Sequence, residues 1–138
     1  MKALTLTQPW ASLMALQAKR IETRSWFTTY RGDLVIHAAK GFPRWARDAC
    51  YEPEFAKALG MSDRDLPLSR GLCVVKLLAC VPTDKMHQVE AVLGHKPSTQ
   101  ELEFGDYSEC RFAWVTEFVR PLLSEPVKGA LGLWNWEE

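Results

Sequence analysis

The strongest constraint on the fold comes from two runs of residues that favour extended backbone. The run GLCVVKLLACV at 71–81 and the run RFAWVTEFV at 111–119 are dense in β-branched and aromatic side chains, which pack well on a pleated surface. The first run carries Lys76 in its middle and is too short to span a membrane. Both runs therefore predict long strands of one sheet, and they exclude a bundle built from helices alone.

Shorter elements surround these two strands in an irregular order. Proline and glycine mark several boundaries: Pro9 suits a first helical turn, and Gly60 suits the residue just after a helix. We find neither a repeated strand–helix–strand unit nor a glycine-rich phosphate loop, which excludes Rossmann and P-loop folds. The pattern favours an α+β fold, a small mixed β-barrel formed by one domain over residues 1–138. The further expected strands are 2–5, 21–26 and 33–39, and the expected helices are 9–18, 44–50, 53–60 and 86–93.

The charge of the chain limits its partners. The 138 residues include 17 basic and 17 acidic side chains, so the formal net charge is zero. No field of the whole protein attracts nucleic acid, and such binding has to come from a local patch. Any RNA held by such a patch is expected to bind weakly to moderately, through a few phosphate contacts. A long duplex, whose affinity rests on many neutralised phosphates, is not expected.

Cysteine usage bears on location and on metal binding. The four cysteines contain no CxxC pair and no zinc-ligand spacing. The N-terminal stretch MKALTLTQPW does not resemble a secretory signal. We therefore expect reduced thiols and a cytoplasmic location, with no metal ion, no cofactor and no membrane partner.

Chemistry-bearing residues gather around the first predicted helix. Gln8 and Trp10 stand at its start, and Lys19, Glu22 and Arg24 follow its end. In an extended segment, Glu22 and Arg24 share a face because side chains alternate with period two. Cations contact phosphate, a carboxylate accepts from a base amino group, and an aromatic ring stacks on a base. This combination predicts a nucleotide-binding site.

Three further residues are candidates for the same site, and simpler interpretations stand beside them. His37 lies on the neighbouring predicted strand, and Lys40 and Arg44 follow it in the turn that leads to Trp45. His37, next to valine and alanine, also fits a hydrogen-bonded core histidine. Trp10 likewise fits a core position on an apolar helix face, and Glu22 with Arg24 fits a structural ion pair on a strand.

Three stretches together resemble the ASCH family, a branch of the PUA-like β-barrel proteins. The family's N-terminal signature, with its GxKxxExR-type motif, resembles the stretch LTLTQPWASLMALQAKRIETRSW followed by RGDLVIHAA. The family's last strands resemble the stretch RFAWVTEFVRPLLSEPVKGALGLWNW. The resemblance implies a PUA-like mixed barrel of five or six strands with flanking helices. It also implies a cleft lined by Lys19, Glu22 and Arg24 that accepts RNA or a nucleotide-like ligand. Gln17 occupies the position where the motif has glycine.

We favour a binding module whose cleft holds RNA or a modified nucleotide. The alternative is a small hydrolase of RNA or a modified nucleoside, with Lys19 as base, Glu22 as its partner and Thr23 near an oxyanion. One bacterial branch similar to ASCH proteins hydrolyses N4-acetylcytidine, but Glu22 stands where that branch has threonine. The predicted strand at 74–79 offers Lys76 and no glutamate. A protein-interaction domain is the second alternative.

Overall fold

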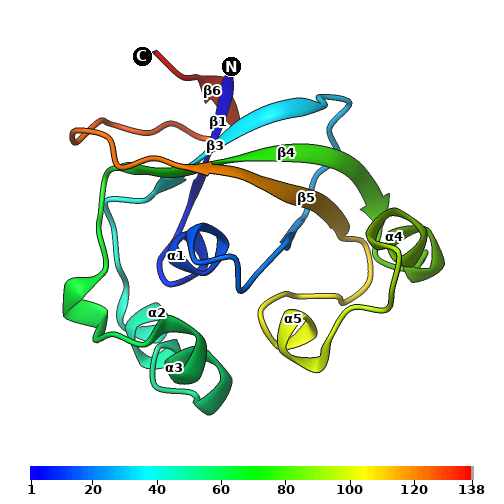
Figure 1. Ribbon diagram of the computed structural model, residues 1–138, viewed down its shortest axis with the longest axis horizontal. Helices are drawn as coiled ribbons and strands as arrows, with labels where there is room; N and C mark the ends of the chain where they lie inside the picture. Colours follow the sequence, from blue (N-terminus) through cyan, green and yellow to red (C-terminus); the bar gives the residue numbers. More distant parts are fainter. Residues whose placement is uncertain (138) are drawn as a thin grey trace.

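The computed structural model of the protein, which describes residues 1–137, contains one six-stranded mixed sheet (Figure 1). The strand order is β2-β5-β4-β3-β1-β6. Only β1 and β3 pair in parallel among the described strands; the other neighbours are antiparallel. The predicted α+β class and the predicted strand number are confirmed. The strands are β1 (Lys2–Leu6), β2 (Ile21–Arg24), β3 (Gly32–Ala38), β4 (Gly71–Pro82), β5 (Phe112–Pro121) and β6 (Leu133–Asn135).

The sheet curls into a half-barrel because its long central strands are bent. The β4–β5 register shifts between Val74 and Val75 and again between Leu77 and Ala79. A further shift interrupts the β3–β4 pairing between Ile36 and His37. Such irregularities bend a strand and increase its twist. The PUA-like barrel predicted from the sequence is therefore present as a curled half-barrel, with β2 and β6 at its edges.

The helices lie on the inner side and at the ends of the curled sheet. Helix α1 lies against the sheet, α2 and α3 lie next to each other farther out, and α4 follows the end of β4 (Figure 1). The helices predicted at 44–50, 53–60 and 86–93 are confirmed, whereas α5 was not predicted. The helices are α1 (Trp10–Ala15), α2 (Arg44–Ala49), α3 (Pro53–Leu59), α4 (Met86–Leu93) and α5 (Thr99–Glu103), with a 3-10 turn at Asp63–Asp65.

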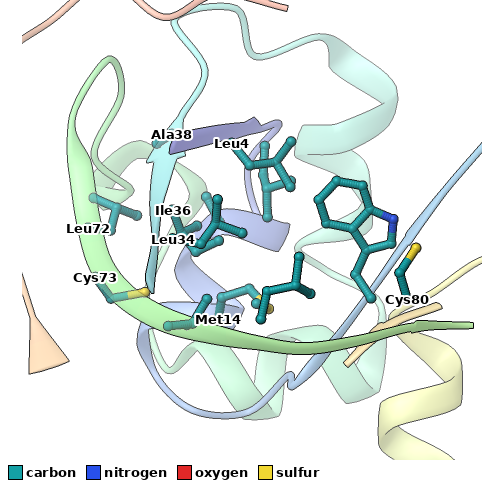
Figure 2. Packing of buried hydrophobic residues seen from close by; sticks show 13 residues of the cluster. Leu4, Met14, Leu34, Ile36, Ala38, Leu72, Cys73 and Cys80 are labelled. Atoms are coloured by element: carbon teal, nitrogen blue, oxygen red, sulfur yellow. The ribbon is translucent and has the colours of Figure 1, made fainter. Parts of the chain in front are cut away.

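Apolar side chains fill the space between α1 and the sheet. Figure 2 shows Leu4, Leu34 and Ile36 meeting Met14 of α1 in this cluster. Trp114 is completely buried in the same core, and Trp26 packs edge-on against it with ring centroids 4.8 Å apart. Burial of side chains of this size contributes about 1.5–3 kcal/mol each, so this cluster holds α1 beside the strands.

The first helix is shorter than predicted because the chain turns after Ala15. The N–H of Ala18 donates to the carbonyl of Leu13, and the N–H of Gln17 donates to the carbonyl of Met14. This double closure is a Schellman motif, which needs a left-handed residue after the helix. Gln17 fills that position with φ of 63°. The prediction that the helix continues to Ala18 was wrong, because nothing in the periodicity marks this turn when glycine is absent.

We expect Gln17→Gly to stabilise the protein by about 0.5–1 kcal/mol. A left-handed conformation costs an L-residue about 1–2 kcal/mol, and glycine's larger entropy in the unfolded chain offsets part of the gain. The Gln17 side chain is exposed, so no packing is lost. Urea unfolding measures the change. The control is Leu16→Gly, at φ of −82°, which should lower stability; a Gln17→Gly variant that is also less stable would contradict the expectation.

Candidate functional site

Lys19, Glu22 and Arg24 form a chain of ion pairs at the start of β2. Lys19 Nζ lies 3.3 Å from Glu22 Oε1, and Arg24 Nη1 lies 3.2 Å from Glu22 Oε2. Lys19 Nζ also donates to the carbonyl of Ile21. The Lys19 side chain has no exposed surface, whereas 11% of the Glu22 side chain is exposed. Glu22 therefore compensates a buried ammonium on one side and presents itself towards solvent on the other.

A cleft of about 400 Å³ opens in front of Glu22 and Arg24. Helices α1 and α2 contribute one tryptophan each, and the end of α5 and its following loop form the facing wall. Four residues predicted for the site line the cleft, namely Trp10, Glu22, Thr23 and Arg24, whereas Lys19 lies behind Glu22 and outside the lining. The full lining comprises Leu6, Thr7, Trp10, Glu22, Thr23, Arg24, Trp45, Glu103, Phe104, Gly105, Asp106 and Arg111.

Two tryptophans form the aromatic side of the cleft. The rings of Trp10 and Trp45 have centroids 5.7 Å apart and are tilted by 42°. Trp10 also packs edge-on against Phe55, which holds it in place. Trp45 is 65% exposed, whereas a large aromatic side chain with a structural role is usually mostly buried. Trp45 was not among the predicted site residues, although its position directly after Arg44, a predicted ligand-binding residue, is a sequence signal for it.

The α5 wall is tied to β2 by a buried carboxylate and two backbone contacts. Glu101 accepts hydrogen bonds from the N–H groups of Arg20 (2.8 Å) and Ile21 (3.3 Å). Thr23 Oγ1 accepts from the N–H of Asp106 (2.9 Å), and Arg111 Nη2 donates to the Thr23 carbonyl (3.1 Å). Burial raises the pKa of Glu101, and its hydrogen bond from Arg20 opposes that shift. This wall is therefore positioned by β2 itself.

The residues of the α5 wall were missed, although one sequence signal for the helix exists. Ser98 caps α5 by accepting from the N–H of Glu101 at 3.0 Å, and the spacing S-x-x-E is typical of a helix start.

Tyr107 packs behind the wall with a buried hydroxyl that lacks a hydrogen-bond partner in residues 1–137. Burial, followed by the charges of Glu101 and Glu22, raises the pKa of Tyr107, so this hydroxyl stays uncharged.

The structure does not bring the other predicted residues to the cleft. Gln8 is buried; its Nε2 donates to Ser12 Oγ and to the Pro67 carbonyl, and its Oε1 accepts from the N–H of Ser12. It therefore fixes the start of α1. Arg44 is exposed on α2, with its Nε 4.0 Å from Asp48. Both lie outside the cleft lining because local turns, which the spacing does not reveal, direct them elsewhere.

His37 lies on the opposite face of the sheet and is fully hydrogen-bonded. Its Nε2 lies 2.8 Å from the Val127 carbonyl, and because a carbonyl only accepts, Nε2 carries the proton. Its Nδ1 is 3.0 Å from Thr5 Oγ1, which in turn accepts from Trp134 Nε1. The structure supports the simpler interpretation of a hydrogen-bonded core histidine. Lys40 lies near it, at a second hollow described below.

Two observations concern metal ions and membranes. Among residues 1–137 we find no group of three or more histidine, cysteine, aspartate or glutamate side chains arranged to hold a metal ion. No helix in this described range has the length and apolar character needed to cross a bilayer. The four cysteines are all free thiols; Cys110 is exposed and the other three are buried.

The fold is a curled mixed half-barrel of six strands with α1 packed against the sheet. The ASCH domain family matches residues 4–125, and the chain belongs to this family. A 40-residue segment is 50% identical to human (Homo sapiens) activating signal cointegrator 1, covering 29% of this chain and 7% of that protein. The mouse (Mus musculus) protein of the same name is 54% identical over 35 residues, 25% of this chain and 6% of its own length. This chain thus matches only a small part of these curated relatives.

One solved structure is similar over most of the chain. The crystal structure of ASCH from Zymomonas mobilis superposes with a TM-score of 0.48 at 13% sequence identity. The match covers 92% of this chain and 72% of the other.

Proposed function

We propose that the protein is a binding module whose cleft holds a nucleobase of RNA or of a modified nucleotide. The observation that carries the proposal is the exposed Trp45 ring, which lies next to Trp10 in the lining of the cleft. Glu22 and Arg24 in the same lining have hydrogen-bonding groups that are free to contact a ligand. A volume of about 400 Å³ lies within the range of small-ligand sites. Stacking of one base on an aromatic side chain contributes about 1–3 kcal/mol.

Glu22 and Arg24 supply the polar side of this site. A carboxylate has about four acceptor positions, and Glu22 uses two of them for its neighbouring cations. Arg24 has five N–H donors, and one of them donates a hydrogen bond to Glu22. The remaining groups form an adjacent donor and acceptor, which matches the edge of a nucleobase. Because the ion pairs already orient both side chains, little ordering is needed when a base binds.

The position of Lys19 gives no support to the hydrolase alternative. Its ammonium is held by Glu22 and the Ile21 carbonyl, has no exposed surface and does not line the cleft. A general base has to come within hydrogen-bond reach of its substrate. On β4, Lys76 is exposed and pairs with Glu117 of β5 in the strand register, away from the cleft lining. We therefore propose binding without assigning a reaction.

The proposal is tested with the purified chain and a panel of small probes. Cytidine, uridine, adenosine, guanosine, N4-acetylcytidine and five-nucleotide single-stranded RNAs are titrated by calorimetry, and each mixture is then analysed by chromatography for products. We expect saturable binding of at least one nucleoside and no conversion. Absence of saturable binding by every probe would contradict the proposal, and hydrolysis of N4-acetylcytidine would favour the enzyme instead.

A further inference from the structure

A second hollow, larger than the cleft, lies on the other face of the sheet where β1 and β3 end. Its volume is about 680 Å³. One side is formed by the strand ends, which contribute Thr5, His37 and Lys40, and the other by the chain segment 126–131 that precedes β6. We call this second cavity the lysine hollow, because Lys40 and Lys128 line it together.

The wall of the lysine hollow is held in place by specific contacts. The N–H of Val127 donates to the Ser69 carbonyl at 2.7 Å, and the Val127 carbonyl accepts from His37 Nε2. Gly129 lies so close to the strands that an added Cβ would come within 2.5 Å of Thr5 Oγ1 and 2.7 Å of His37 Cε1. Only glycine fits this approach without displacing the neighbours. The segment 126–131 is therefore fixed to the sheet by hydrogen bonds and by close packing at Gly129.

The two cavities differ in charge. Three carboxylates and two guanidinium groups line the cleft, and the carboxylate of Glu22 is further compensated by the buried Lys19. The cleft therefore offers no net positive charge to a phosphate. In the lysine hollow, the only charged lining residues are Lys40 and Lys128, and neither forms an ion pair within residues 1–137. An anion is favoured in the lysine hollow and not in the cleft.

The chain connects the cleft and the lysine hollow at two points. Thr5 of β1 lines the hollow and Thr7, the first residue after β1, lines the cleft, so one residue separates them in the chain. The segment from Lys40 to Trp45 likewise begins at the hollow and ends at the cleft. The N–H of Ala39 donates to the Leu6 carbonyl at 2.9 Å and keeps these two connections together. Both cavities therefore lie near the same ends of β1 and β3.

We propose that the lysine hollow is a phosphate-binding site: Lys40 and Lys128 hold the backbone of the RNA strand whose base occupies the cleft. This inference rests on the proposed function of the cleft. It divides recognition between a base site without net positive charge and a separate site for phosphate. Lysine binds phosphate as a compact point charge, and apolar groups such as Leu131, which is 99% exposed, provide surface for a ribose. The division also explains how a chain of zero net charge contacts RNA.

The test uses the double variant Lys40→Ala/Lys128→Ala with two probes, the nucleoside that binds best and a five-nucleotide RNA carrying that base in the middle. We expect nucleoside affinity to stay within two-fold. For the RNA, affinity should fall, and the slope of log K against log salt should become shallower by about 1.4, or about 0.7 for each phosphate released. The control variant Lys57→Ala/Lys85→Ala removes the same charge from exposed positions outside both cavities and should leave RNA affinity and slope unchanged.

The outcomes separate this inference from the function on which it rests. If the nucleoside binds but the double variant keeps the wild-type RNA affinity and salt slope, the phosphate site is wrong and the base site stands. If neither probe binds the wild-type chain, the proposed function fails and this inference fails with it. An octaglutamate peptide that binds the wild type more tightly than RNA, and loses affinity in the double variant, would assign the hollow to an acidic protein partner and overturn the proposal.

Discussion

Replacing Glu22 by alanine is expected to destabilise the protein by about 3–5 kcal/mol. The substitution removes the carboxylate 3.3 Å from Lys19 Nζ and leaves a fully buried ammonium hydrogen-bonded to the Ile21 carbonyl, with the Glu101 carboxylate acting on it only through the charge. Removal of one partner of a buried ion pair has a cost of this size. Urea unfolding followed by tryptophan fluorescence measures it as a large fall in the midpoint concentration.

Three further variants show whether the buried charge is the cause. Lys19→Met removes the ammonium and leaves Glu22 paired with Arg24 and partly exposed, so it should cost less than Glu22→Ala. The double variant Lys19→Met/Glu22→Ala should be more stable than Glu22→Ala alone. Asp48→Ala, which breaks an exposed pair, should change stability by less than about 0.5 kcal/mol. Equal losses for Glu22→Ala and the double variant would contradict this explanation.

Replacing Trp45 by alanine is expected to weaken nucleoside and RNA binding about 5- to 150-fold without lowering stability. The loss corresponds to about 1–3 kcal/mol for one stacked base. Stability should be unaffected because the Trp45 side chain is mostly exposed on α2. Calorimetric titration measures the affinity, and thermal unfolding of the same samples measures the stability.

Matched aromatic variants make this result specific to the cleft. Trp45→Phe keeps a ring for stacking and should retain most of the affinity. Tyr51→Ala removes an aromatic ring of similar exposure, 64%, that does not line the cleft; ligand affinity should stay at the wild-type value. Binding that is unchanged in Trp45→Ala would show that bases do not stack on this ring, and the aromatic side of the proposed site would then be wrong.

Most of the secondary structure could be predicted because it follows local patterns. The apolar runs at 71–81 and 111–119 became β4 and β5, each with a boundary within two residues. Gly60 ends α3 with φ of 64°, as expected for a glycine just after a helix. Period-two alternation also placed Glu22 and Arg24 on one face of β2, where they do pair. These features depend on neighbours in the chain, and the sequence contains them completely.

The α5 wall and the helix end at Gln17 could not be predicted in this way. The wall depends on Glu101 reaching the backbone of Arg20 and Ile21, a contact between segments far apart in the chain. Gln17 adopts φ of 63° where the chain turns between α1 and β2, although its residue type does not favour that conformation. The wall therefore depends on a long-range contact, and the turn depends on a residue whose type does not indicate the conformation that it adopts.

The sequence by itself determined the family, because three of its stretches resemble that family. It also determined the strands and the Glu22–Arg24 pair, because these follow from the periodicity and spacing of neighbouring residues. Only the tertiary structure decided where each side chain faces. It buried Lys19 behind Glu22, placed Trp45 beside Trp10, and moved His37 and Lys40 to a separate cavity on the other face of the sheet. The physical reason is that alternation assigns residues to two faces of a strand, whereas the curl of the sheet and the segments packed on it determine which face is buried, which is open, and what each one meets.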